Sequence, residues 1–179
     1  MSAARSAATP LPRLTLVLGG ARSGKSRHAE RLVLASGLVP VYLATAEALD
    51  EEMAARIAAH RARREPAWRT VEVALELVAA LTTECAAGRA VLADCLTLWL
   101  TNLMVHERPV AAEIERLIEV LPRLPGSLVL VSNEVGQGVV PAAAMARAFV
   151  DHAGLLHQRI AERADAVLLM TAGLPQRLK

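Results

Sequence analysis

The chain has 179 residues, of which 54% are hydrophobic and only 2% aromatic, and it carries 20 basic against 18 acidic side chains. This length suits one ordinary domain with an aliphatic core, and the near balance of charge argues against a polyelectrolyte contact with nucleic acid. No apolar run approaches the ~20 residues that a membrane-spanning helix needs, and residues 1–13 lack the apolar centre of a secretory signal. We therefore expect a cytoplasmic protein with a flexible tail over 1–13 and a single domain over 14–179.

Short aliphatic runs alternate with longer helical stretches along the chain. In chain order the sequence predicts a strand over 13–20, a helix over 25–36, a strand over 38–45, a helix over 46–64, a strand over 68–73, a helix over 74–88, strands over 89–97 and 126–135 with a helix over 111–120 between them, a helix over 141–164 and a strand over 165–173. Uninterrupted aliphatic strands that alternate with helices are typical of a mostly parallel sheet covered on both faces. The expected fold class is therefore α/β, a three-layer sandwich with a mostly parallel central sheet.

The first predicted strand runs into a glycine-rich loop, and a helix follows directly. Residues 19–26 read GGARSGKS and match G-x-x-x-x-G-K-[ST] in the strand–loop–helix context that this motif requires. In such a P-loop, backbone N–H groups and the helix N-terminus face phosphate oxygens, and the lysine reaches the outer phosphates. The sequence therefore predicts a P-loop NTPase-like domain that binds a nucleoside triphosphate, with a chance glycine-rich turn as the alternative. The residues assigned to this site are Gly19, Gly20, Ala21, Arg22, Ser23, Gly24, Lys25 and Ser26, with Lys25 as a catalytic cation.

A magnesium ion is expected beside the bound phosphates. P-loop proteins hold Mg²⁺ with the hydroxyl that follows the lysine and with an acidic residue, directly or through water. Here these residues are Ser26 and Asp94, and Asp94 comes at the end of the aliphatic run 90–93. An aspartate at the end of a strand can instead cap the next helix, so that interpretation of Asp94 stays open.

The predicted helix over 46–64 is acidic at its start and rich in arginine at its end. Both clusters suit the helix macrodipole, so stabilisation of the helix is one explanation for them. His60 lies seven residues after Met53 on the apolar face of this helix, beside the arginines within 61–64. A buried, hydrogen-bonded histidine fits this position. A nucleophilic imidazole beside a phosphate site fits it too, because neighbouring cations keep the imidazole neutral.

Six segments occur in an order that resembles one enzyme family. They read GGARSGKS, YLATAEALDEEMAARIAAHRARR, WRTVE, DCLTLWLTNL, SNEVGQGVVP and AGLLHQRIAERAD. Together they resemble the bifunctional adenosylcobinamide kinase / adenosylcobinamide-phosphate guanylyltransferase family of cobalamin assembly, over nearly all of residues 14–173. The resemblance is specific, because the ATAEALDEEM…RI…H helix and the NEVGxGxVP segment are not general features of P-loop proteins.

This resemblance implies two reactions on one scaffold. A nucleoside triphosphate, ATP or GTP, phosphorylates adenosylcobinamide, and GTP then loses pyrophosphate to give a GMP–histidine intermediate that passes GMP to adenosylcobinamide phosphate. The family's nucleophilic histidine falls on His60. Its guanine-nucleotide contacts fall on Ala44, Thr45, Ala46, Arg61, Ala62, Arg63, Arg64, Glu72 and Asp94. The family also implies a homo-oligomer, specifically a trimer.

Two other functions fit parts of the sequence. A single-activity P-loop kinase of a small metabolite would use Lys25 and Asp94 and would leave His60 inert. A nucleotide-dependent switch or a recombinase-like module fits less well, because the sequence has no N-K-x-D signature of Ras-type switches and few aromatic residues for a DNA face. The chain also departs from the family's pattern at Val150 and His157, where arginine and asparagine are usual.

Overall fold

The computed structural model describes residues 10–48, 51–62 and 66–179, except for the side chains of Met53, Arg56, Ile57, Ala59, His60 and Arg61. Its centre is a seven-stranded sheet with the strand order β3-β2-β4-β5-β1-β6-β7. The strands are β1 (Leu14–Gly19), β2 (Val39–Ala44), β3 (Arg69–Glu72), β4 (Arg89–Asp94), β5 (Ser127–Asn133), β6 (Ala166–Thr171) and β7 (Leu174–Arg177). All neighbours run parallel except β6 and β7. The predicted α/β class with a mostly parallel sheet is confirmed.

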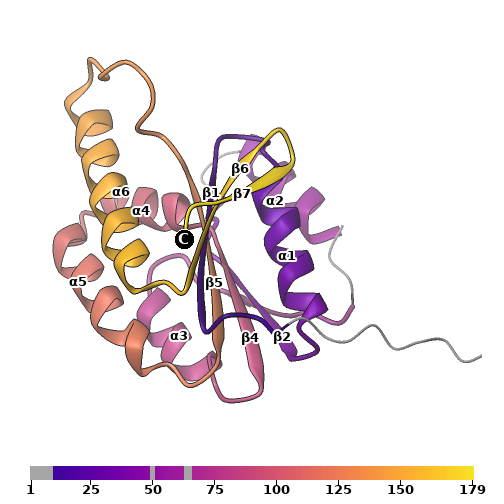
Figure 1. Ribbon diagram of the computed structural model, residues 1–179. Coiled ribbons are helices and arrows are strands. Elements are labelled where there is room, and N and C mark those ends of the chain that lie inside the picture. The colour runs from indigo at the N-terminus through magenta and orange to yellow at the C-terminus, as the bar shows by residue number, and fades with distance from the viewer. Residues whose placement is uncertain (1–9, 49–50, 63–65) are drawn as a thin grey trace, which may run out of the picture.

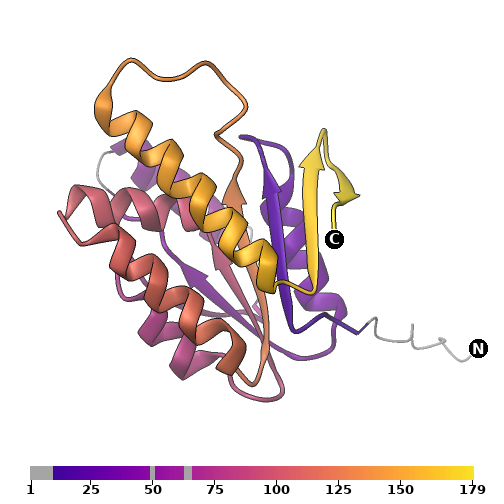
Figure 2. The same cartoon turned by 60° about the vertical axis from the view of Figure 1, so that its left-hand side comes forward.

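Helices cover both faces of this sheet, as Figures 1 and 2 show. They are α1 (Lys25–Ala35), α2 (Glu51–Ala62), α3 (Leu77–Glu84), α4 (Leu96–Val105), α5 (Val110–Val120) and α6 (Ala144–Arg163), with a 3-10 turn η1 (Leu121–Arg123) after α5. Helix α1 contacts β1, β4 and β5 on one face, whereas α3, α4 and α6 contact strands on the other face. The result is the expected three-layer sandwich.

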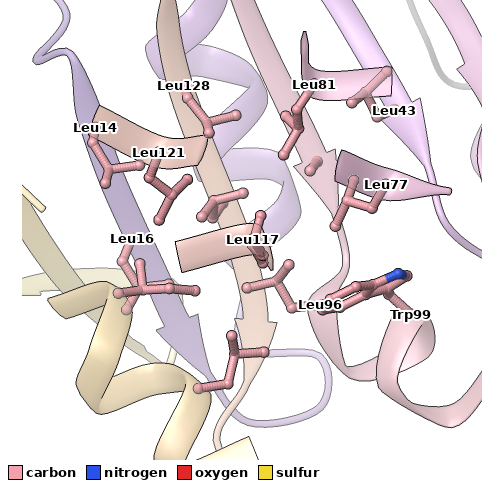
Figure 3. Packing of buried hydrophobic residues seen from close by; sticks show 14 of the residues in the cluster. Leu14, Leu16, Leu43, Leu77, Leu81, Leu96, Trp99, Leu117, Leu121 and Leu128 are labelled. Carbon is pink, nitrogen blue, oxygen red and sulfur yellow. The ribbon is translucent and has the colours of Figure 1, made fainter. Parts of the chain in front are cut away.

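Aliphatic side chains fill both spaces between the sheet and its helices. On the face covered by α3 to α6, Leu14 and Leu16 of β1 belong to a leucine-rich cluster that also encloses Trp99 (Figure 3). On the other face, Val17 of β1 packs in a cluster with Val33 of α1. Successive residues of β1 thus enter opposite layers, as expected for a strand buried on both faces. Within the described residues, no helix combines the length and the apolar character that crossing a membrane requires.

The structure corrects the predicted elements in two places. The strand predicted over 89–97 ends at Asp94, and α4 follows it. Helix α4 escapes prediction because most of its side chains are buried in the core, so its sequence is apolar on nearly all sides and lacks a one-sided helical pattern. Strand β7 escapes prediction because all four of its residues are exposed. It pairs with β6 through a two-residue turn at Ala172 and Gly173, with φ angles of 52° and 81°.

Two predicted helices are shorter than their sequence pattern suggests. Residues 45–48 are not helical, and α2 is described from Glu51 instead of residue 46. Helix α3 covers Leu77–Glu84 instead of 74–88, because carbonyl groups before it bond to side chains of α4. Helix boundaries depend on such contacts between distant residues, which propensity alone does not encode.

Candidate nucleotide site

The parallel strands end along one edge of the sheet, and predicted site residues from four strands lie there. Gly19 ends β1, Ala44 ends β2, Glu72 ends β3 and Asp94 ends β4. The strand register pairs Ala44 with both Glu72 and Asp94, so these three residues form a row. In Figure 2 the loop after β1 and the long loop before α6 both lie at this edge. Open α/β sheets bind their ligands outside the carboxyl ends of their strands, so this edge is the candidate site.

The loop between β1 and α1 is closed by its own backbone and braced by the β6–β7 turn. The Ser23 N–H donates to the Gly20 carbonyl at 3.2 Å, and the Gly173 N–H donates to the Ser23 carbonyl at 3.0 Å. Gly24 adopts a left-handed conformation, with φ of 89°, and directs the chain into α1. The first free N–H groups of α1 therefore follow the loop directly, as in a phosphate-binding cradle. The exposed residues of the loop are Gly20, Ala21 and Arg22.

Side chains in this loop favour an anionic ligand. Lys25 is largely buried, and its Nζ donates to the Gly20 carbonyl at 3.1 Å. The Ser23 hydroxyl is also buried and makes no hydrogen bond with any described residue. A buried hydroxyl without a partner costs free energy, which a bound phosphate oxygen would recover. Ser26 lies half-buried in the first turn of α1. These residues fit the triphosphate that the sequence predicts.

The carboxylate of Asp94 accepts a hydrogen bond from the neighbouring strand β2. Its charge, like that of Lys25, influences the pKa of the buried thiol of Cys95. Tyr42 of β2 donates its hydroxyl to Asp94 Oδ2 at 2.8 Å, and its ring packs edge-on against Trp68. Burial raises the pKa of the Cys95 thiol to about 11; the charge of Asp94 adds to this rise, and that of Lys25 opposes it. Asp94 ends β4, two strands from β1, at the same edge of the sheet as the phosphate loop. It is not the N-cap of α4, because that position belongs to Cys95, which makes no side-chain cap bond.

The segment after β2 is fixed by buried hydrogen bonds. Thr45 is fully buried, and its Oγ1 donates to the Cys95 carbonyl at 2.8 Å. Its own carbonyl accepts from Asn102 Nδ2 of α4 at 2.8 Å, and the same nitrogen donates to the Ala74 carbonyl at 3.0 Å. Ala46 follows, half-buried. Thr45 thus holds the row of strand ends in place, and its predicted nucleotide contact stays a prediction.

The predicted nucleophile and its arginines are described only in part. His60 and Arg61 belong to the last turn of α2, but their side chains lie outside the described residues. Arg63 and Arg64 lie outside them altogether. Ala62 ends α2 and is exposed, and Glu72 is exposed at the end of β3. The assignment of these residues to a guanine nucleotide therefore stays a prediction.

Sequence reasoning misses two polar side chains at this edge. Tyr42 donates a hydrogen bond to Asp94. Tyr42 is the only tyrosine in the chain and lies in an aliphatic strand, and this unusual position could have indicated its role. Asn133 ends β5 opposite Gly19 in the register. Its signal is a polar residue at the end of an aliphatic run, within the SNEVG segment. Neither residue belongs to the P-loop motif, so only the strand order brings them to the site.

His157, one of the departures from the family's pattern, lies on the far side of β5 from α1. It is buried on α6, with its Nε2 2.7 Å from the Ser132 hydroxyl oxygen. Burial lowers the pKa of His157 below its usual value, and the charge of Glu134 opposes this shift. Val150, the other departure, is half-buried on the same helix. The Ser132–His157 pair joins β5 to α6 within the leucine-rich layer.

Comparison with known proteins decides the family. Residues 15–178 match the cobinamide kinase / cobinamide phosphate guanyltransferase family. The chain belongs to this family. It is 57% identical to the bifunctional adenosylcobalamin biosynthesis protein CobP of Pseudomonas aeruginosa, over 92% of this chain and 96% of that protein. It is 42% identical to the bifunctional adenosylcobalamin biosynthesis protein CobU of Salmonella typhimurium, over 93% of this chain and 99% of that protein. As a member of this family, the chain is an enzyme of the kinase and nucleotidyltransferase classes.

Two solved structures have a similar fold. The RadB recombinase superposes with a TM-score of 0.53 and 18% identity, over 89% of this chain and 74% of that chain. The flagellar accessory protein FlaH from Methanocaldococcus jannaschii superposes with a TM-score of 0.55 and 12% identity, over 95% of this chain and 79% of that chain. At such low identity the likeness shows the fold alone.

The substitution Gly19→Ala should deform the phosphate loop. A Cβ atom at this position would lie 2.5 Å from Ser23 Oγ and 2.9 Å from the Met170 carbonyl oxygen, so the backbone must shift. We expect the free energy of unfolding to fall by about 1–3 kcal/mol, a typical cost of overpacking, and GTP binding to weaken. Urea unfolding and GTP titration measure the two effects. Gly20→Ala is the matched control, because its Cβ would meet nothing within 4 Å. Equal urea midpoints for the two variants would contradict this role of Gly19.

Proposed function

We propose that this chain phosphorylates adenosylcobinamide with a nucleoside triphosphate and then transfers GMP from GTP to adenosylcobinamide phosphate, giving adenosylcobinamide-GDP. The phosphate cradle over 19–26, in a chain whose family description names both activities, is the observation that supports this proposal most strongly. Both reactions consume a triphosphate, and they differ in the phosphorus atom that is attacked. One loop can therefore serve both.

In the first reaction the loop positions the nucleotide and neutralises its charge. The aminopropanol oxygen attacks the γ-phosphorus, the bond from that phosphorus to the bridging oxygen breaks, the nucleoside diphosphate leaves, and the hydroxyl proton passes to solvent. Lys25 and the N–H groups of the loop face the charge that moves onto the leaving oxygen. The buried Ser23 hydroxyl can donate to the same phosphate group. The acceptor substrate has only to bring its hydroxyl into line.

In the second reaction His60 supplies the nucleophile. An imidazole nitrogen of His60 attacks the α-phosphorus of GTP, the bond to the bridging oxygen breaks, and pyrophosphate leaves. A phosphate oxygen of adenosylcobinamide phosphate then attacks the same phosphorus, the nitrogen–phosphorus bond breaks, and the imidazole returns to its neutral form. This splits one transfer into two displacements, which is the use of covalent catalysis.

Other residues of the proposal hold the guanine nucleotide. We assign Arg61, Arg63 and Arg64 to its phosphates, because guanidinium groups match phosphate geometry. Glu72 can accept from a guanine N–H or a ribose hydroxyl. The segment of Ala44, Thr45 and Ala46 lines the end of β2, where Ala44 pairs with Glu72. We also propose that the chain acts as a homo-oligomer, a trimer as the family resemblance implies.

Magnesium fits the donors at the loop. Ser26 and Asp94 offer a hydroxyl and a carboxylate, which are the hard oxygen ligands that Mg²⁺ prefers alongside phosphate oxygens and water. Within residues 10–48, 51–62 and 66–179, no group of three or more His, Cys, Asp or Glu side chains is suited to a metal ion. A partial protein ligand set is typical of Mg²⁺, which keeps its waters. When bound, the ion neutralises charge on the phosphates.

The substitution His60→Ala should separate the two reactions. Alanine offers no nitrogen nucleophile, so covalent labelling of the protein by α-labelled GTP should disappear. Phosphorylation of adenosylcobinamide should persist, because it needs only the phosphate loop and a positioned hydroxyl. Alanine favours helix, so α2 should remain folded. The measurement is label retained on the denatured protein, beside a separate kinase assay. His152→Ala, on α6, is the matched control and should retain the label.

The outcome also decides between the candidate functions. The label on the unmodified protein should be acid-labile and alkali-stable, as a nitrogen–phosphorus bond is, and should form with release of pyrophosphate. Label that persists in His60→Ala would exclude His60 as the nucleophile and direct the search to His28, His106 and His157. A kinase activity lost as completely as the transfer would contradict the division of roles. An unmodified protein without label would favour a single-activity kinase.

The substitution Asp94→Asn should raise the Mg²⁺ concentration needed for half-maximal turnover by roughly tenfold or more. The amide retains an acceptor for the Tyr42 hydroxyl but loses the negative charge, so metal positioning should suffer more than nucleotide binding. Titration of both reaction rates with Mg²⁺ measures the shift. Tyr42→Phe removes the hydrogen bond and keeps the charge, so its shift should be smaller. An unchanged Mg²⁺ dependence in Asp94→Asn would remove Asp94 from the metal site.

A further inference from the structure

The end of β5 lies between the end of β1, where the phosphate loop begins, and the end of β4, which carries Asp94. In the sheet, β5 has β1 on one side and β4 on the other (Figure 1). The register places Asn133 opposite Gly19 of β1, and it places Asp94 of β4 opposite Val131. Neighbouring strands lie about 4.8 Å apart. Asn133 therefore lies one strand away from the start of the phosphate loop, on the side of the loop where Asp94 lies. The next residue reinforces this pairing, because the Glu134 N–H donates to the Gly19 carbonyl at 3.0 Å.

Asn133 also faces the side of the sheet where the phosphate loop continues into α1. Val131 and Val129, two and four residues earlier on β5, pack in the cluster that contains Val33 of α1. Because side chains alternate along a strand, Asn133 shares the face of these valines. The same cluster contains Cys95, the buried residue on which the charges of Lys25 and Asp94 both act. The carboxamide is thus beside Cys95, the residue that directly follows Asp94 in the chain.

One hydrogen of the Asn133 amide is fixed, and the other has only a weak acceptor. Asn133 Nδ2 donates to Thr97 Oγ1 at 2.7 Å, and Thr97 Oγ1 lies 3.2 Å from Cys95 Sγ. Nδ2 itself is 4.0 Å from Cys95 Sγ. A thiol sulfur is a poor acceptor, whereas a phosphate oxygen is a strong, charged one. Asn133 is only half-buried, so a ligand can reach it.

We propose that Asn133 contacts the terminal phosphate of the bound triphosphate through its side-chain N–H and positions that group for transfer to the acceptor hydroxyl. Thr97, on the first turn of α4, holds the carboxamide in place from the other side. The contact distinguishes a triphosphate from a diphosphate, and it acts on the group that moves in the kinase reaction. This inference rests on the proposed triphosphate site and adds to it a residue that the P-loop motif does not contain.

The test compares affinity for a triphosphate and a diphosphate. The probes are the α,β-methylene analogues of GTP and GDP, whose carbon bridge prevents loss of pyrophosphate on attack at the α-phosphorus. In Asn133→Ala the preference for the triphosphate analogue should fall by about tenfold, since a hydrogen bond to a charged group is lost. The kcat of the kinase reaction should fall by 10- to 100-fold, with a smaller change in the KM for the nucleotide.

Ser132→Ala is the matched control. It removes a buried hydrogen bond from the adjacent residue on the opposite face of β5, where Ser132 contacts His157. A comparable fall in thermal stability is expected, with an unchanged triphosphate preference. Should Asn133→Ala fail to fold, Asn133→Ser replaces it. The same fall in triphosphate preference is expected, because a serine hydroxyl is too short to reach a phosphate bound in the loop over 19–26.

The possible outcomes separate this inference from the proposed function. A lost triphosphate preference in the Asn133 variant alone supports the inference. A preference that is unchanged in the Asn133 variant, or lost equally in Ser132→Ala, overturns the inference and leaves the proposed function standing. An unmodified protein that binds neither analogue overturns both.

Discussion

The shape of the phosphate loop is the constraint on which the rest of the site depends. Gly19 leaves no room for a side chain against Met170 of β6, and Gly24 makes a left-handed turn into α1. The hydrogen bond from Gly173 to Ser23 ties the same loop to the β6–β7 turn. The loop is therefore supported by β6 on one side and by α1 on the other. Its N–H groups are organised before a nucleotide arrives, which lowers the entropic cost of binding.

The strand order determines which other residues reach this loop. Because β5 separates β1 from β4, Asp94 is one strand further from the loop than Asn133 is. Buried hydrogen bonds then fix each strand end: Tyr42 holds Asp94, and Thr97 holds Asn133. Below this edge the layers are almost wholly aliphatic. The core thus sets the positions of the strands, and the polar groups at their ends set the chemistry.

Much of this arrangement could be predicted from local sequence. The P-loop is a contiguous motif, so its residues and its strand–loop–helix context are visible together, and the long aliphatic runs mark the buried strands. Helix α4 could not be predicted, because a helix surrounded by core has no polar face. Strand β7 could not be predicted either, since its pairing with β6 depends on the turn at Gly173 instead of on burial. Asn133 acquires its place only through the order of the strands, which no local pattern contains.

The central claim is that one phosphate loop serves both phosphoryl and guanylyl transfer, and Lys25→Ala tests it most directly. The measurement is a paired assay of one preparation: phosphorylation of adenosylcobinamide, and covalent labelling of the protein by α-labelled GTP. Because both reactions place a triphosphate against the Lys25 ammonium group, both rates should be abolished together while the protein stays folded. Normal turnover in either reaction would contradict the account, since that reaction would then use a different phosphate site.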